Sequence, residues 1–154
     1  MTSPIVHHTF VIEKTYPHAV TKVYAAFADP TTKARWFAPG HPQPGATFES
    51  DFRVGGQERL TSIMGDNTPF PGAVLSSQAL YLDIVADRRI VMGSNMMMNG
   101  TPFSGSLVSF EFEAAGDGTR LTCTHQGAFF ENADGPQMRE DGWRHLLDRL
   151  GETI

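Results

Sequence analysis

Apolar and polar residues alternate over residues 6–16, which is the pattern of a β-strand, and Pro17 then ends it. The period changes in the next segment, where apolar residues recur at i, i+3, i+4 and i+7. This spacing predicts one apolar face on a helix over residues 19–29. The apolar face consists of Val20, Val23, Tyr24 and Phe27.

A second short helix is predicted directly after the first. Asp29 is a favourable N-cap, and Pro30 is a favourable first helical residue. The sequence TTKARWF continues the helix, and Pro39 and Gly40 end it. The two helices therefore follow each other almost without a loop.

From residue 45 to residue 130, strand-length segments alternate with turn residues, which predicts an antiparallel meander. Glycines in the turns supply the positive φ angles that tight hairpins need. The turns are expected at Gly55-Gly56, Asp87-Arg88 and Gly116-Asp117-Gly118. The strands are expected near residues 45–53, 57–65, 73–84, 89–97, 103–115 and 118–129.

The last segment, residues 136–153, begins with Pro136 and has the pattern of an amphipathic helix. Its charged residues occupy the other face, so the helix is expected to lie on the sheet. The apolar face consists of Trp143, Leu146, Leu147, Leu150 and Ile154. The element order is β-α-α-β6-α, which predicts an α+β fold with an antiparallel sheet.

Length and charge narrow the class of protein. A chain of 154 residues fits one domain at roughly 100–200 residues per domain, so residues 1–154 are interpreted as a single domain. The net charge of −5 has the wrong sign for a phosphate-binding surface, and no nucleic-acid partner is expected. The single cysteine, Cys123, cannot form an intramolecular disulfide. With no export signal and no membrane span in the sequence, a cytoplasmic protein without a membrane partner is expected.

Four motifs, in this order along the chain, resemble one protein family. They are YPHAVTKVYAAFADPTTKARWFAP at residues 16–39, Arg53-Val54-Gly55-Gly56, Gly118-Thr119-Arg120-Leu121-Thr122 followed by Thr124-His125-Gln126-Gly127, and Gly142-Trp143-x-x-Leu146-Leu147-Asp148-Arg149-Leu150. From about residue 6 to 152 the chain is similar to homologues of the activator of heat-shock protein 90 ATPase. That family is a branch of the START-like, or SRPBCC, superfamily, which includes polyketide cyclases, lipid carriers and stand-alone bacterial domains.

The resemblance implies a helix-grip fold, which is also the fold of the birch-pollen allergen. In it a curved antiparallel sheet, here of about seven strands, wraps round a long C-terminal helix and leaves a cavity between them. Trp36 and Phe37 are then expected at the cavity mouth, where aromatic rings offer a wall for a ring-containing or acyl ligand. Trp143 on the last helix is a further aromatic candidate. For Trp36 the alternative is that it only packs the helix pair against the sheet.

Methionines on the strand at residues 89–97 are candidates for a ligand wall. Alternation places Ile90, Met92, Ser94 and Met96 on one face. Methionine is flexible and polarizable, so Met92 and Met96 suit apolar ligands of varied shape. The alternatives are ordinary gap filling and an exposed edge of a homodimer, an assembly that the sequence leaves open.

His125 is the polar residue of greatest interest. Alternation with Leu121 and Cys123 places it on the inward face of the last strand. An inward imidazole can hydrogen-bond a ligand carbonyl or transfer a proton near neutral pH, so His125 is a ligand-binding candidate and a weak catalytic candidate. A core histidine bonded to a backbone carbonyl and a solvent-exposed rim residue are the alternatives.

Other chemistries lack sequence support. No Gly-x-Ser-x-Gly or His-Glu-x-x-His motif occurs, and His7 and His8 are adjacent on a strand and point to opposite faces. Cys123 is expected to be a buried, inert thiol. Glu111 and Glu113 are expected on a solvated face. No metal and no cofactor are expected.

The leading hypothesis is a small-molecule-binding protein whose partner is an apolar, amphipathic or aromatic small molecule held between the sheet and the C-terminal helix. A second is a cyclase-like or hydratase-like enzyme that uses His125 for proton transfer. A third is a chaperone-interacting protein like the activators themselves. Those activators contain a further domain, for which 154 residues leave no room.

Overall fold

The computed structural model describes residues 4–38 and 46–154, which form seven strands and three helices. The strands form one antiparallel sheet in the order β1-β7-β6-β5-β4-β3-β2. The first strand lies beside the last, with Val6 opposite Phe129 and Tyr16 opposite Thr119. The strands are β1 (Val6–Tyr16), β2 (Thr47–Ser50), β3 (Gln57–Ile63), β4 (Val74–Val85), β5 (Arg89–Met98), β6 (Thr101–Ala115) and β7 (Gly118–Phe129).

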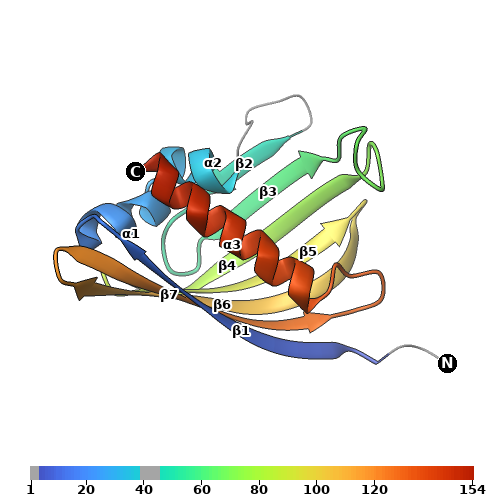
Figure 1. Cartoon of the computed structure of the whole chain (residues 1–154). Coiled ribbons are helices and arrows are strands. Elements are labelled where there is room, and N and C mark those ends of the chain that lie inside the picture. Colours follow the sequence, from blue (N-terminus) through green and yellow to red (C-terminus); the bar gives the residue numbers. More distant parts are fainter. Residues whose placement is uncertain (1–3, 39–45) are drawn as a thin grey trace.

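The long last helix crosses one face of the curved sheet, and the two short helices lie beside its C-terminal end (Figure 1). The carboxylate of Asp29 accepts hydrogen bonds from the Thr31 amide at 3.2 Å and the Thr32 hydroxyl at 2.7 Å, and so caps the second helix as predicted. The α+β helix-grip architecture is confirmed. The helices are α1 (Val20–Ala28), α2 (Pro30–Phe37) and α3 (Pro136–Thr153).

The predicted element bounds mostly lie within two or three residues of the observed ones, as is usual for element ends. The strand expected at residues 45–53 is shorter and runs only from Thr47 to Ser50. Residues 39–45, which include the predicted helix end at Pro39 and Gly40, lie outside the described residues.

The hairpin between β5 and β6 turns at Asn99-Gly100, a site absent from the predicted turns. Both residues have positive φ angles, 50° for Asn99 and 83° for Gly100. Two such residues in succession are typical of the type I′ turn, for which Asn-Gly is the preferred sequence. The signal was therefore present in the sequence, and because of this turn β6 begins at Thr101 instead of residue 103.

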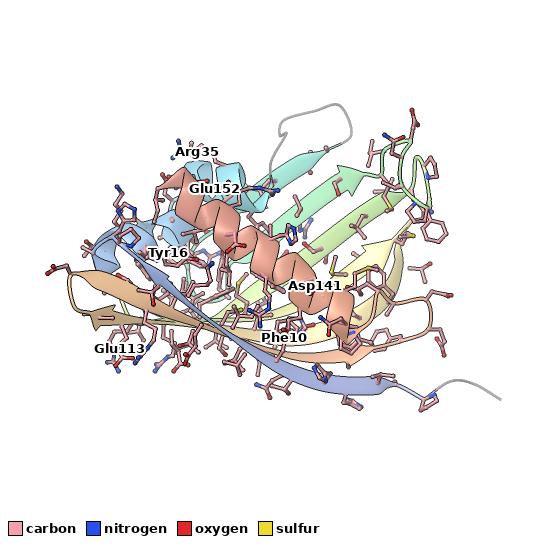
Figure 2. The ribbon with its side chains drawn as sticks, viewed as in Figure 1. Phe10, Tyr16, Arg35, Glu113, Asp141 and Glu152 are labelled. Atoms are coloured by element: carbon pink, nitrogen blue, oxygen red, sulfur yellow. The ribbon has the colours of Figure 1, made fainter. Side chains whose placement is uncertain are left out.

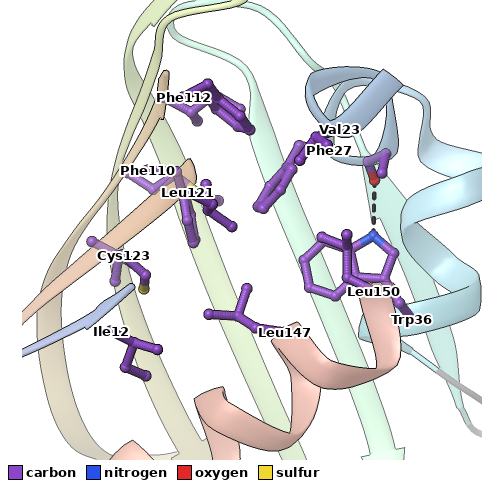
Figure 3. Close-up of a cluster of buried hydrophobic side chains, with 14 of the residues drawn as sticks. Ile12, Val23, Phe27, Trp36, Phe110, Phe112, Leu121, Cys123, Leu147 and Leu150 are labelled. Carbon is purple, nitrogen blue, oxygen red and sulfur yellow. Dashed lines mark hydrogen bonds between the residues drawn. The ribbon is translucent and has the colours of Figure 1, made fainter. Parts of the chain in front are cut away.

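The hydrophobic core lies between the sheet, the short helices and the C-terminal half of α3 (Figure 3). Ile12, Leu121 and Cys123 of the paired strands β1 and β7 are fully buried there together with Leu147 of α3. The hydroxyl of Tyr16 donates a hydrogen bond to the Leu147 carbonyl at 2.8 Å, which links β1 to α3. The predicted burial of Cys123 is confirmed.

The opposite face of the sheet is solvated, as predicted. Glu111 and Glu113 are exposed, and Figure 2 shows Glu113 pointing away from α3. On the same strand Phe110 and Phe112 are buried. Alternation along β6 therefore separates the core from solvent.

Candidate functional site

A cavity of about 370 Å³ lies between α3 and the sheet. This volume falls within the range of roughly 300–1,000 Å³ that is usual for small-molecule sites. Its mouth is marked by Met138 and Gly142 of α3, which line the cavity and are also exposed to solvent. The apolar part of the lining consists of Phe37, Leu60, Ala79, Met92, Met96, Val108, Met138, Trp143 and Leu146.

Five of the six predicted ligand-binding residues lie together in this lining. They are Phe37, Met92, Met96, His125 and Trp143. They come from α2, β5, β7 and α3, so the fold brings together residues far apart in the chain. The ring of Phe37 lies 6.0 Å from that of Trp143, centroid to centroid, and the two rings connect α2 with α3 at the cavity wall.

Trp36 is the sixth, and its predicted place in the cavity is wrong. Its side chain is 0% exposed and is absent from the cavity lining. The indole Nε1 donates a hydrogen bond to the Ala26 carbonyl at 2.9 Å, and its ring packs against Phe27 of α1 (Figure 3). A buried indole needs a partner for its N–H, and the end of α1 supplies one. Trp36 therefore joins the two short helices and packs in the core. This agrees with the alternative interpretation, in which it packs the helix pair against the sheet.

His125 is buried in the cavity wall, with 1% of its surface exposed. Its imidazole stacks on Phe10 of the neighbouring strand, and its Nδ1 has no hydrogen-bond partner within the described residues. Burial lowers the pKa of His125 to about 4, and the positive charge of Arg139 acts in the same direction. The ring is therefore neutral at pH 7.

An ion pair that the sequence analysis missed lies beside His125. Arg139 donates to both carboxylate oxygens of Asp134 at 2.8 Å, and to the Ser104 hydroxyl at 2.8 Å. Arg139 and Ser104 are buried. The sequence could have indicated that Arg139 points inward, because it precedes Trp143 by four residues and so continues the apolar face of α3.

A second buried ion pair joins α2 to β3 at the cavity wall. Lys33 Nζ lies 2.5 Å from Glu58 Oε2, and the two side chains are only 3% and 4% exposed. Glu58 also accepts a hydrogen bond from Tyr81 at 2.7 Å, and the Tyr81 hydroxyl lies 2.8 Å from Ser50 Oγ. Burial, and then the charge of Glu58, raise the pKa of Tyr81. The spacing of Lys33 with Trp36 and Phe37 on one helix face could have indicated that it points inward.

The groups that line this cavity can hold a ligand through apolar contacts and hydrogen bonds. The only cysteine, Cys123, is buried, and burial raises its pKa to about 12, so its thiol is protonated at pH 7. Within residues 4–38 and 46–154, no three histidine, cysteine, aspartate or glutamate side chains form a group able to hold a metal ion. What remains is an apolar wall, one neutral imidazole, small hydroxyls and two ion pairs.

None of the helices in the described part of the chain has both the length and the apolar character that a membrane span requires.

Comparison with known proteins gives a family and a fold. The family model described as activator of Hsp90 ATPase homolog 1-like protein matches residues 17–154. No curated protein matches. The solved structure of Mll3558 from Rhizobium loti is 40% identical, with 99% of this chain and 100% of that chain covered and a TM-score of 0.87.

Two further solved structures show the same architecture. A protein from Rhizobium leguminosarum is 31% identical, with 97% of this chain and 95% of that chain covered and a TM-score of 0.88. CalU16 from Micromonospora echinospora is 24% identical, with 94% of this chain and 74% of that chain covered and a TM-score of 0.61. At that identity CalU16 shows the fold alone.

Proposed function

We propose that this chain, which belongs to the family of activator of Hsp90 ATPase homolog 1-like proteins, binds an apolar or amphipathic small molecule between α3 and the sheet. The fold of that family supports a ligand-binding or cyclase-like domain. The observation that carries this proposal is the cavity of about 370 Å³ with its mostly apolar lining. An enclosed apolar surface with a few convergent polar groups is the usual form of a small-molecule site.

The lining suits a ligand with a ring or a short chain. Met92 and Met96 contribute adaptable thioethers, while Phe37 and Trp143 contribute flat aromatic surfaces. Burial of apolar ligand surface here is favourable by about 25 cal/mol per Å². Polar side chains at the wall then determine which ligands fit.

Gly142 offers a way to block the site without damaging the fold. It lines the cavity, and a Cβ added there would meet no heavy atom within 4 Å. Leucine at this position would occupy the mouth and would also be the better helix former by about 1 kcal/mol. We expect Gly142→Leu to be at least as stable as the wild type and unable to bind. Gly142→Ala is the matched control, since it makes the same kind of helix change but fills little of the cavity.

The test is a thermal-shift screen with flavonoids, polyketide-like aromatics and medium-chain fatty acids. A ligand at a hundred times its dissociation constant stabilises the fold by about 2.7 kcal/mol, which raises the melting temperature by about 5–10 °C for a chain of this size. The shift should persist in Gly142→Ala and vanish in Gly142→Leu. If no ligand produces a shift, or if Gly142→Leu keeps it, the proposal is wrong.

The low pKa of His125 favours ligand binding over a cyclase-like or hydratase-like reaction. A general base works best when its pKa lies near the working pH. With a pKa of about 4, His125 is a weak base at neutral pH, although it can still accept or donate a hydrogen bond.

A further inference from the structure

The charges in the cavity wall balance one another. The charged residues of the described lining are Lys33, Glu58, Asp134 and Arg139. Each cation is already paired: Lys33 with Glu58 at 2.5 Å, and Arg139 with both oxygens of Asp134 at 2.8 Å. A ligand carboxylate would therefore enter an apolar site in which no free positive charge is ready to receive it.

Among the described residues that line the cavity, the side chain of His125 has a polar atom without a partner. Its Nδ1 makes no hydrogen bond, and only 1% of the residue's surface is exposed. Buried polar atoms are nearly always satisfied by protein, water or ligand. The ring is held in place by stacking on Phe10 at 4.6 Å between centroids, and by Phe129 on the same strand at 6.3 Å.

From these two observations, and resting on the proposed function, we infer that the ligand is uncharged and carries a hydroxyl or similar neutral polar group that hydrogen-bonds to His125, with its apolar body against Met92, Met96 and Trp143. A hydroxyl fits because it can donate and accept, and so pairs with either tautomer of a neutral imidazole. An uncharged ligand leaves both ion pairs intact. A fatty acid or other carboxylate of the same size would have to break one of them or remain unpaired.

The experiment compares three probes with the same ring system: naphthalenemethanol, methylnaphthalene and naphthoate. Their dissociation constants are measured by calorimetry at pH 7 for the wild type and for His125→Leu. We expect naphthalenemethanol to bind at least about tenfold more tightly than naphthoate, because the carboxylate would be buried without a free cation. We expect His125→Leu to weaken the alcohol about fivefold to tenfold and to leave methylnaphthalene nearly unchanged, because only the alcohol loses a hydrogen bond.

A measurement on the wild type keeps the inference testable if His125→Leu does not fold. The ring nitrogens of His125 are observed by NMR while naphthalenemethanol or methylnaphthalene is added. A change in the nitrogen chemical shifts that is larger with the alcohol supports the hydrogen bond.

The outcomes separate this inference from the proposed function. Naphthoate that binds as tightly as the alcohol would overturn the inference and leave small-molecule binding in place. The same holds if His125 responds equally to the alcohol and the hydrocarbon. If none of the three probes binds to the wild type, and the ligand screen also gives no shift, the proposed function itself fails.

Discussion

The imidazole of His125 stacks on the phenyl ring of Phe10 directly across the β1–β7 pair, with ring centroids 4.6 Å apart and ring planes 4° from parallel. This contact buries a titratable ring in the cavity wall. Burial lowers the pKa of this ring most, the charge of Arg139 lowers it further, and the charge of Asp134 raises it in part. Because the folded chain disfavours the protonated ring, the contact couples the stability of the protein to pH.

Stability should fall as the pH decreases through the range in which His125 is neutral only in the folded state. The unfolded chain binds a proton at this histidine near pH 6.5, and the folded chain does so only near pH 4. Protons therefore favour unfolding between these values, and the stabilisation present above pH 6.5 is lost as the pH falls towards 4.

The loss from His125 alone is up to about 3 kcal/mol, because each pKa unit corresponds to about 1.4 kcal/mol. Chemical denaturation of the wild type and His125→Leu at several pH values between 4.5 and 7 measures it. The difference in unfolding free energy between the two proteins should shrink or reverse as the pH falls. Parallel curves would show that His125 is not the group responsible.

Arg139 should matter far more to stability than an arginine on the exposed face of the same helix. Arg139→Met leaves the buried Ser104 hydroxyl and the Asp134 carboxylate without their partner. We expect a cost of about 2–3 kcal/mol. Arg144→Met removes an exposed pair with Glu140, and we expect less than about 0.5 kcal/mol. The free energy of unfolding of both variants is measured in urea. Equal losses would contradict the burial of Arg139.

The pair of Lys33 and Glu58 should show strong coupling. Lys33→Met leaves the Glu58 carboxylate in a site where it is only 4% exposed, and we expect a loss of about 3 kcal/mol. The double variant Lys33→Met/Glu58→Leu removes both charges and should recover most of that loss, while Tyr81 can still bond to Ser50. A double-mutant cycle in urea measures the coupling. If the losses from Lys33→Met alone and Glu58→Leu alone simply add in the double variant, the ion pair does not act as a unit.

Gly56 should tolerate no side chain. A Cβ at this position would lie 2.0 Å from the Asp51 carbonyl oxygen, which is backbone and cannot easily move. We expect Gly56→Ala to cost about 2 kcal/mol or more through this overlap. Gly65→Ala is the control, since an added Cβ there meets nothing within 4 Å. Thermal unfolding of both variants gives the comparison, and a Gly56→Ala protein as stable as Gly65→Ala would refute the predicted clash.

Local patterns in the sequence were sufficient to predict the elements and the faces of most strands. Alternation along β7 correctly placed Leu121, Cys123 and His125 on one face, because successive side chains of a strand point to opposite sides wherever the strand lies. The order of the elements, with the motifs that resemble the family, also predicted the helix-grip architecture and a cavity beneath the last helix. Met92 and Met96 followed from the same alternation.

Only the tertiary structure decided which polar residues meet. Periodicity shows that Lys33 and Arg139 share faces with apolar residues, but it does not show that their partners are Glu58 on β3 and Asp134 before α3. It also could not decide whether Trp36 faces the cavity or the carbonyl of Ala26. Such contacts depend on strand register and on the position at which each helix crosses the sheet. These are set by the packing of the whole chain, whereas a sequence pattern reports only the face of its own element.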